Sequence, residues 1–263
     1  MSNTKGKKMD NTERYINYDD ESIDELAKPQ SKLGKIIVAI LLVVCFAAVA
    51  VIIFRIVLFN YYPGEMKRLY VDEKFSEFYK ANNGDVETIT QDLRFGYDNN
   101  ELGNFWGSNL IIVKNIDKDG SDRVQITVRF NVSALEDIKE RYGIEGDIDP
   151  DSDFLDFAMY KNDNKTGMNE DGSLPDYKFL PEDIVGEVVH VEKDSFAMYR
   201  YYKLVFDGIQ LDGGDEAPKW LSLGVFVKGY SGEEPYANVL IYENHDEFSE
   251  FEEYKLSSKE RPE

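Results

Sequence analysis

The chain has 263 residues, with 30 basic and 51 acidic side chains and a formal net charge of −21 at pH 7. The first 59 residues hold 8 of the basic and 7 of the acidic residues, so 22 basic and 44 acidic residues follow. Such an acidic region repels nucleic acid, which excludes nucleic acid as an expected partner. The one cysteine is Cys45, so the region after residue 59 contains no disulfide and depends on an apolar core.

Residues 1–35 are polar and charged, and we expect them to form a disordered cytoplasmic tail. Within them, Tyr15, Ile16 and Tyr18 are spaced among acids. This spacing leaves open a second interpretation, in which the tail is a short linear motif that folds on a protein partner.

A transmembrane helix is predicted over residues 36–59. Between Lys35 and Arg55, nineteen residues contain no charge, amide or hydroxyl. As a helix they would span about 28 Å, close to the ~30 Å hydrocarbon core of a bilayer. The sequence therefore predicts an integral membrane protein with one span.

Two other interpretations of the apolar run fit less well. Ala48-Val49-Ala50 is similar to a signal-peptide cleavage site, but apolar residues follow it and a long acidic segment precedes the run. Cys45 partly fits a lipoprotein attachment motif, which requires a small residue where Val44 stands. We therefore expect an uncleaved signal-anchor.

Basic residues that flank the span predict its orientation. Lys28, Lys32 and Lys35 precede it, whereas Arg55 is the one close basic residue at its other end. The positive-inside rule places the N-terminus in the cytoplasm and the C-terminal domain outside the cell membrane. This layout and the lack of disulfides favour a bacterial cell envelope.

Residues 60–92 are expected to form a membrane-proximal helix or stalk. Tyr61-Tyr62 is typical of an aromatic pair at the membrane interface. Pro63 begins an apolar pattern of helical period, and Asn82-Asn83-Gly84 ends it.

Residues 93–263 change to strand periodicity. Leu110-Ile111-Ile112-Val113 and residues 124–132 predict a hairpin, in which Gln125, Thr127 and Arg129 form the polar face of the second strand. Further strands are expected at 154–160, 184–191, 197–206, 220–229 and 237–244. The fold class is a mainly-β extracytoplasmic domain, an elaborated antiparallel β-sandwich with an immunoglobulin-like layout, and the alternative is α+β.

Short helices are expected beside these strands. Ser133 and Glu136 form a capping-box pattern at the start of a helix that ends at Gly143. At the end of the chain, aromatic residues three apart and early acids predict a closing helix over 245–256.

An acidic loop is the main candidate metal site. Acids occupy every second position, namely Asp147, Asp149, Asp151 and Asp153. In an extended loop they could direct oxygens at a calcium ion, which requires six to eight oxygen ligands. The loop is not an EF-hand, and a solvated surface loop is the alternative. Asp117, Asp119 and Asp122 are a weaker instance, as are Asp212 and Asp215.

Enzyme signatures are incomplete. Ser231 lies in an imperfect G-x-S-x-G pattern, and the two histidines, His190 and His245, form no zinc motif. Aromatic residues such as Tyr201, Tyr202, Trp220 and Tyr230 suggest a sugar platform less well than they suggest a core. We therefore expect a non-enzymatic binding or assembly protein. A calcium or ligand sensor and an envelope hydrolase are the alternatives.

Overall fold

The computed structural model describes residues 31–93, 105–162, 184–212, 220–232, 235–243 and 251–263. The chain divides into two compact units, Met1–Asn60 and Tyr61–Glu263. Each is described by itself below.

The described residues of the first unit form one long apolar helix, α2 (Lys32–Asn60, 29 residues). Its length and composition are those of a helix that could cross a membrane, as an anchor or as a signal sequence. Ser31 explains the start of the helix, because its Oγ accepts a hydrogen bond from the Gly34 backbone N–H at 3.1 Å. The predicted apolar helix is confirmed, and it begins four residues earlier than expected.

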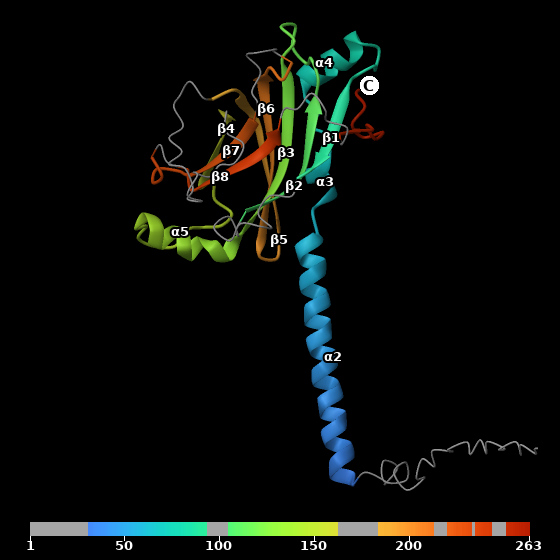
Figure 1. Cartoon of the computed structure of the whole chain (residues 1–263), viewed down its shortest axis with the longest axis vertical. Coiled ribbons are helices and arrows are strands. Elements are labelled where there is room, and N and C mark those ends of the chain that lie inside the picture. The colour runs from blue at the N-terminus through green and yellow to red at the C-terminus, as the bar shows by residue number, and fades with distance from the viewer. Residues whose placement is uncertain (1–30, 94–104, 163–183, 213–219, 233–234, 244–250) are drawn as a thin grey trace, which may run out of the picture. The chain divides into compact units, whose positions relative to one another are not determined.

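The second unit contains two antiparallel sheets (Figure 1). The six-stranded sheet has the order β5-β6-β3-β2-β1-β9 and the three-stranded sheet has the order β4-β7-β8. The strands are β1 (Thr88–Asp92), β2 (Phe105–Val113), β3 (Asp122–Asn131), β4 (Leu155–Asn162), β5 (Glu187–Phe196), β6 (Tyr199–Ile209), β7 (Trp220–Val227), β8 (Ala237–Glu243) and β9 (Glu252–Glu253). The prediction of a mainly antiparallel β domain is confirmed.

The main core lies between the two sheets. Alternate residues of β3, such as Val124, Ile126 and Val128, contribute to it together with Leu221 and Leu223 of β7. The predicted β2–β3 hairpin is confirmed, since Val113 pairs with Arg123 and Phe105 with Phe130. Close packing also explains Gly224 in β7, where a Cβ would lie 2.7 Å from Cε2 of Tyr160.

β3 is buried on both faces, so the predicted polar face of this strand does not lie in solvent. Gln125, Thr127 and Arg129 are all 1 % exposed or less. Gln125 accepts a hydrogen bond from the Tyr70 N–H at 2.7 Å and donates to the Arg68 carbonyl at 2.8 Å. The polar face of β3 therefore binds the backbone of a segment that lies far away in the sequence.

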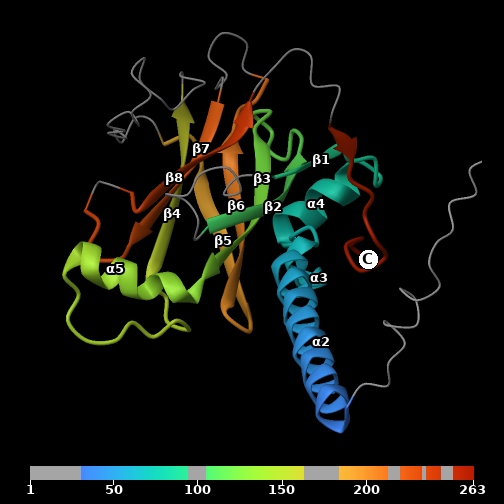
Figure 2. The same ribbon diagram turned by 60° about the horizontal axis from the view of Figure 1, so that its bottom comes forward.

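The same segment, which follows Pro63, also differs from the prediction of a single helix. It forms two helices, α3 (Gly64–Lys67) and α4 (Glu73–Ala81), with an extended connection between them. Thr127 donates to the Met66 carbonyl at 2.8 Å, so β3 binds backbone groups at the end of α3. Figure 2 shows α4 beside the six-stranded sheet, on the side away from β4, β7 and β8. The predicted end of the helix, at Asn82, is confirmed.

The C-terminal segment also differs from its prediction. Residues 244–250 of the expected closing helix lie outside the described residues, and β9 follows as a strand paired with β1. Residues three apart point to opposite faces of a strand. Accordingly, Phe251 packs on the main core, whereas Tyr254 joins a second cluster on the other face of the sheet, with Leu69, Phe75 and Ile111.

The helix α5 (Leu135–Tyr142) confirms the prediction, with Gly143 at its C-terminus in the left-handed conformation at φ 61°. Its start differs from the expected capping box. A short 3₁₀ turn, η2 (Val132–Ala134), comes first, and the side chain of Asn131 accepts the hydrogen bond from the Ser133 N–H.

Candidate binding surface

Strand β5 lies at an edge of the six-stranded sheet, and β6 is its one strand neighbour in the described part of the chain. Among the described residues, no backbone hydrogen bond other than those with β6 reaches 187–196. One row of β5 N–H and C=O groups therefore faces away from the sheet. An edge of this kind is a template for pairing with another strand.

Apolar side chains gather along the same edge. Outside α2, nine large hydrophobic side chains of the described residues are exposed, and six of them lie between residues 184 and 198. They are Ile184, Val188, Val189, Val191, Phe196 and Met198. Single exposed apolar residues are normal on protein surfaces, whereas larger apolar patches mark binding surfaces.

The sheet architecture explains why these valines are exposed. Val188 lies opposite Phe206 and Val191 opposite Leu204 in the β5–β6 ladder, and directly opposite residues share a face of the sheet. Phe206 and Leu204 belong to the main core. Among the described residues the facing sheet has three strands against six, and Val188 and Val191 stay 39 % exposed although their ladder partners are buried.

The start of β5 is held close to β6. A Cβ on Gly186 would lie 2.9 Å from Cγ1 of Ile209, so glycine is required there. The ladder then shifts register between Val188 and His190. A bulge of this kind turns a strand edge and changes the direction of its side chains.

The other face of β5 is polar and already engaged. His190, one of the two histidines that form no zinc motif, stacks on the ring of Tyr70 with 3.9 Å between centroids. Lys203 donates to Glu192 at 2.8 Å. Burial by itself would raise the pKa of the Glu192 carboxyl, but the hydrogen bond and charge of Lys203, aided by His190, leave that pKa below its ordinary value.

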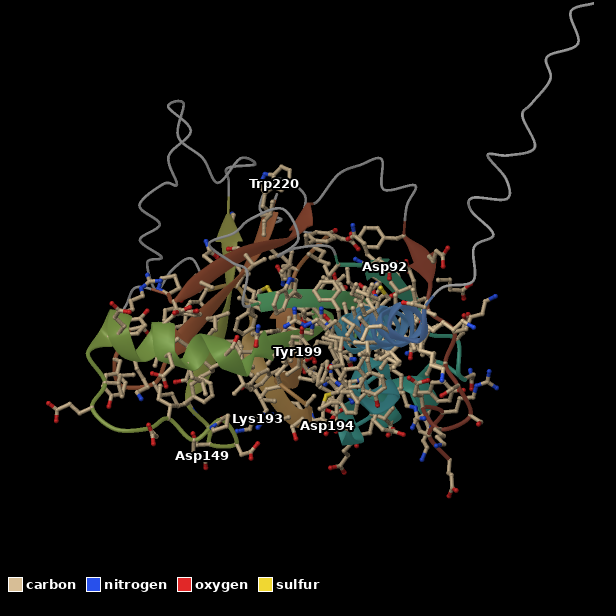
Figure 3. The ribbon with its side chains drawn as sticks, turned by 90° about the horizontal axis from the view of Figure 1, so that it is seen from below. Asp92, Asp149, Lys193, Asp194, Tyr199 and Trp220 are labelled. Atoms are coloured by element: carbon tan, nitrogen blue, oxygen red, sulfur yellow. The ribbon has the colours of Figure 1, made fainter. Side chains whose placement is uncertain are left out.

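The acidic loop lies near the hairpin of β5 and β6, and its carboxylates contact different cations. Asp147 pairs with Lys139 at 3.1 Å, and Asp151 pairs with Arg200 at 2.9 Å. Asp153 pairs with both Lys228 and Lys193, and the hydrogen bond from Lys228, followed by that from Lys193, lowers the pKa of its carboxyl. Figure 3 shows Lys193 and Asp194 on β5, with Asp149 on the same side of the unit.

Asp149 has a local role. Its Oδ1 accepts a hydrogen bond from the Asp151 N–H at 2.9 Å, which stabilises the turn. Among the described residues, no group of three or more His, Cys, Asp or Glu side chains is arranged to hold a metal ion. The calcium site at the four acids stays a prediction, and calcium would have to compete with the lysine and arginine partners.

A buried charge cluster was not anticipated. Arg123, on β3, is fully buried and pairs with Asp207 at 2.6 Å and with Asp72 at 2.9 Å. Lys74 joins it through Asp207, at 2.8 Å, and also contacts Asp117. Burial would lower the pKa of Arg123, but its two carboxylate partners raise it. The alternation predicted for residues 124–132, extended one residue towards the N-terminus, is the sequence signal that could have placed Arg123 on the polar face.

Arg129, at the other end of β3, is surrounded by aromatic rings. Its guanidinium lies 4.6 Å from the Tyr199 ring centroid and 5.0 Å from those of Tyr62 and Trp106. Contacts of this kind stabilise a cation away from water. This aromatic enclosure fixes the segment that begins at Tyr61 against the six-stranded sheet.

The remaining candidates have structural positions. Ser231 lies in a turn, where its Oγ accepts from the Val227 N–H at 2.9 Å. Tyr201, Tyr202 and Trp220 are buried, as expected for a core, while Tyr230 is exposed. His245 and Asp215 lie outside the described residues, as does the tail before residue 31.

Comparisons of the chain with protein-family models, with curated proteins and with solved structures found no match.

Proposed function

We propose that this chain is a membrane-anchored, non-enzymatic binding protein of the cell envelope. Its tail would lie in the cytoplasm and its β domain outside, in an immunoglobulin-like sandwich layout. The observation that carries the proposal is the exposed apolar edge of β5. A protein partner would add an extended segment to this edge, with backbone hydrogen bonds for affinity and side-chain contacts to Val188 and Val191 for specificity.

Charge favours a particular kind of partner. The chain after residue 59 has 44 acidic and 22 basic residues, and β5 itself carries Glu187, Glu192 and Asp194. Its one lysine, Lys193, is paired with Asp153. An extended segment in which basic and apolar residues alternate fits this edge. A second copy of the chain fits poorly, because two surfaces of the same charge repel each other.

Six carboxyl groups in the described part of the chain lack the ionisation behaviour that a general acid needs. A general acid needs a raised carboxyl pKa, as in glycosidases. Six carboxyl groups among the described residues have lowered pKa values instead, because their hydrogen bonds and neighbouring charges outweigh burial. They are Asp72, Asp119, Asp153, Glu192, Asp207 and Glu260.

Two matched substitutions test the proposal. Val191 and Leu240 both lie on edge strands, of different sheets, and are 39 % and 40 % exposed. Full-length Val191→Lys should lose a partner that co-purifies with the wild-type chain after crosslinking in intact membranes, whereas Leu240→Lys should keep it. Equal capture of the partner by the wild-type chain and by both variants would show that the partner binds outside the edge of β5. Turnover of an envelope substrate by the wild-type chain would favour the hydrolase alternative.

A further inference from the structure

The tip of the β5–β6 hairpin contacts Tyr61, the first residue of the β domain (the second unit). This hairpin tip consists of Phe196, Ala197 and Met198. The rings of Phe196 and Tyr61 lie 4.5 Å apart, and the Tyr201 hydroxyl donates to the Tyr61 carbonyl at 2.9 Å. Tyr201 is fully buried, so the position of Tyr61 on this hairpin is fixed by the core of the domain.

Covalent structure limits how far the hairpin tip can lie from the end of α2. Tyr61 follows Asn60, the last residue of α2, and consecutive Cα atoms are about 3.8 Å apart. The headgroup layer on each side of a bilayer is roughly 5–7 Å thick. If α2 spans a membrane and ends at that layer, Tyr61 is the residue of the β domain nearest to the layer along the chain, and the ring of Phe196 lies beside Tyr61.

The hairpin tip carries exposed aromatic and thioether side chains that suit a membrane interface. Phe196, Met198 and Tyr61 are 40 %, 46 % and 42 % exposed. The tip is also held in place, because the Met198 carbonyl accepts a hydrogen bond from the Val132 N–H at 2.8 Å. Moving a fixed, exposed group of aromatic and thioether side chains from water into the interfacial layer lowers the free energy.

We propose that the hairpin tip inserts into the headgroup layer of the membrane that holds α2, and so gives the β domain a second attachment to it. The partner is a lipid surface with zwitterionic headgroups, because Asp194 and the acidic domain would be repelled by anionic lipid. This inference rests on the proposed anchoring role of α2. With two attachments, β5 would be presented at a fixed height above the membrane.

Fluorescence quenching in vesicles tests the insertion. Full-length protein would be reconstituted in phosphatidylcholine vesicles and labelled at a single cysteine with an environment-sensitive fluorophore. The native Cys45 reports on α2. In a Cys45→Ser background, Met198→Cys reports on the hairpin tip and Lys118→Cys is the control. Lys118 is exposed in the turn before β3, whose ten residues separate it from the tip by about 30 Å.

Nitroxides on lipid chains should quench the label at Cys45, and nitroxides on headgroups should quench Met198→Cys at least about twofold more than Lys118→Cys. Phe196→Cys would give the same result as a second position. If Cys45 is quenched but the tip and control labels respond equally, the insertion is refuted while the anchor stands. If Cys45 is not quenched, the anchor is refuted and the insertion with it.

Discussion

The guanidinium of Arg123 donates from Nε to Oδ1 of Asp207 at 2.6 Å, and its other side contacts Asp72. Asp72 is the N-cap of α4 and accepts a hydrogen bond from the Phe75 N–H. One buried side chain of β3 thereby connects the helix α4 with β6. Buried charges are costly unless each is paired, so the cluster depends on all of its members.

Arg123→Met should destabilise the β domain by about 3–5 kcal/mol, because it leaves Asp207 and Asp72 without their main cation. Arg141→Met is the matched control, since Arg141 is exposed and should contribute less than about 1 kcal/mol. Urea unfolding of the full chain in micelles, followed by tryptophan fluorescence, measures both. Equal midpoints for the two variants would show that the buried cluster does not stabilise the domain.

The same cluster predicts a loss of stability in acid. Burial would raise the pKa of Asp207, but Arg123 and Lys74 hold it below its ordinary value of 3.8. The ionised Asp207 carboxylate therefore stabilises the fold at pH values above its ordinary pKa. This contribution is lost as the pH falls through the lower pKa of the folded state. Asp207→Asn should reduce the slope of unfolding free energy against pH below about pH 4. An unchanged slope would assign the acid sensitivity to other groups.

Glu260 should attach the C-terminal segment to the domain. It is 3 % exposed, and its oxygens accept from the Leu69 N–H at 2.6 Å and the Ser257 N–H at 2.7 Å. Glu260→Gln should cost about 1.5–3 kcal/mol, the range for a hydrogen bond to a charged group. Limited trypsin cleavage after Lys255 or Lys259 should become faster than in Glu263→Gln, where the residue is exposed. Cleavage at the same rate in both variants would contradict this role.

Calcium should leave the melting temperature unchanged up to millimolar concentration, because the acidic loop already pairs with basic side chains such as Arg200. A ligand that binds only the folded state must stabilise it, so titration calorimetry and thermal unfolding test the site together. Saturable heat that disappears in Asp151→Asn would instead support the calcium sensor.

The strands could be predicted from sequence because their periodicity is local. Val124, Ile126 and Val128 alternate with polar residues, and this alternation indicates a strand whatever lies around it. The covering of the polar face could not be predicted, since Gln125 and Thr127 bind backbone groups of residues about 60 positions earlier. Both side chains could form equally good hydrogen bonds with water, so the sequence alone does not indicate their partners.

The structure of the C-terminal segment likewise depends on residues far away in the sequence. Phe251 and Tyr254 are three residues apart, which fits one face of a helix and also the two faces of a strand. The pairing of β9 with β1 decides between them, and that pairing joins residues more than 160 positions apart. Exposed valines on β5 likewise resemble core residues in sequence, because only the sheet order places that strand at an edge.

The most direct measurement is site-specific photocrosslinking at the edge of β5 in intact membranes. A photoreactive phenylalanine analogue would be placed at Val191 in one full-length chain and at Leu240 in another, both similarly exposed. A discrete adduct from position 191 alone, with a protein whose crosslinked peptide is extended and basic, is the predicted result. Adducts of equal yield from both positions, or none from position 191, would contradict binding at this edge.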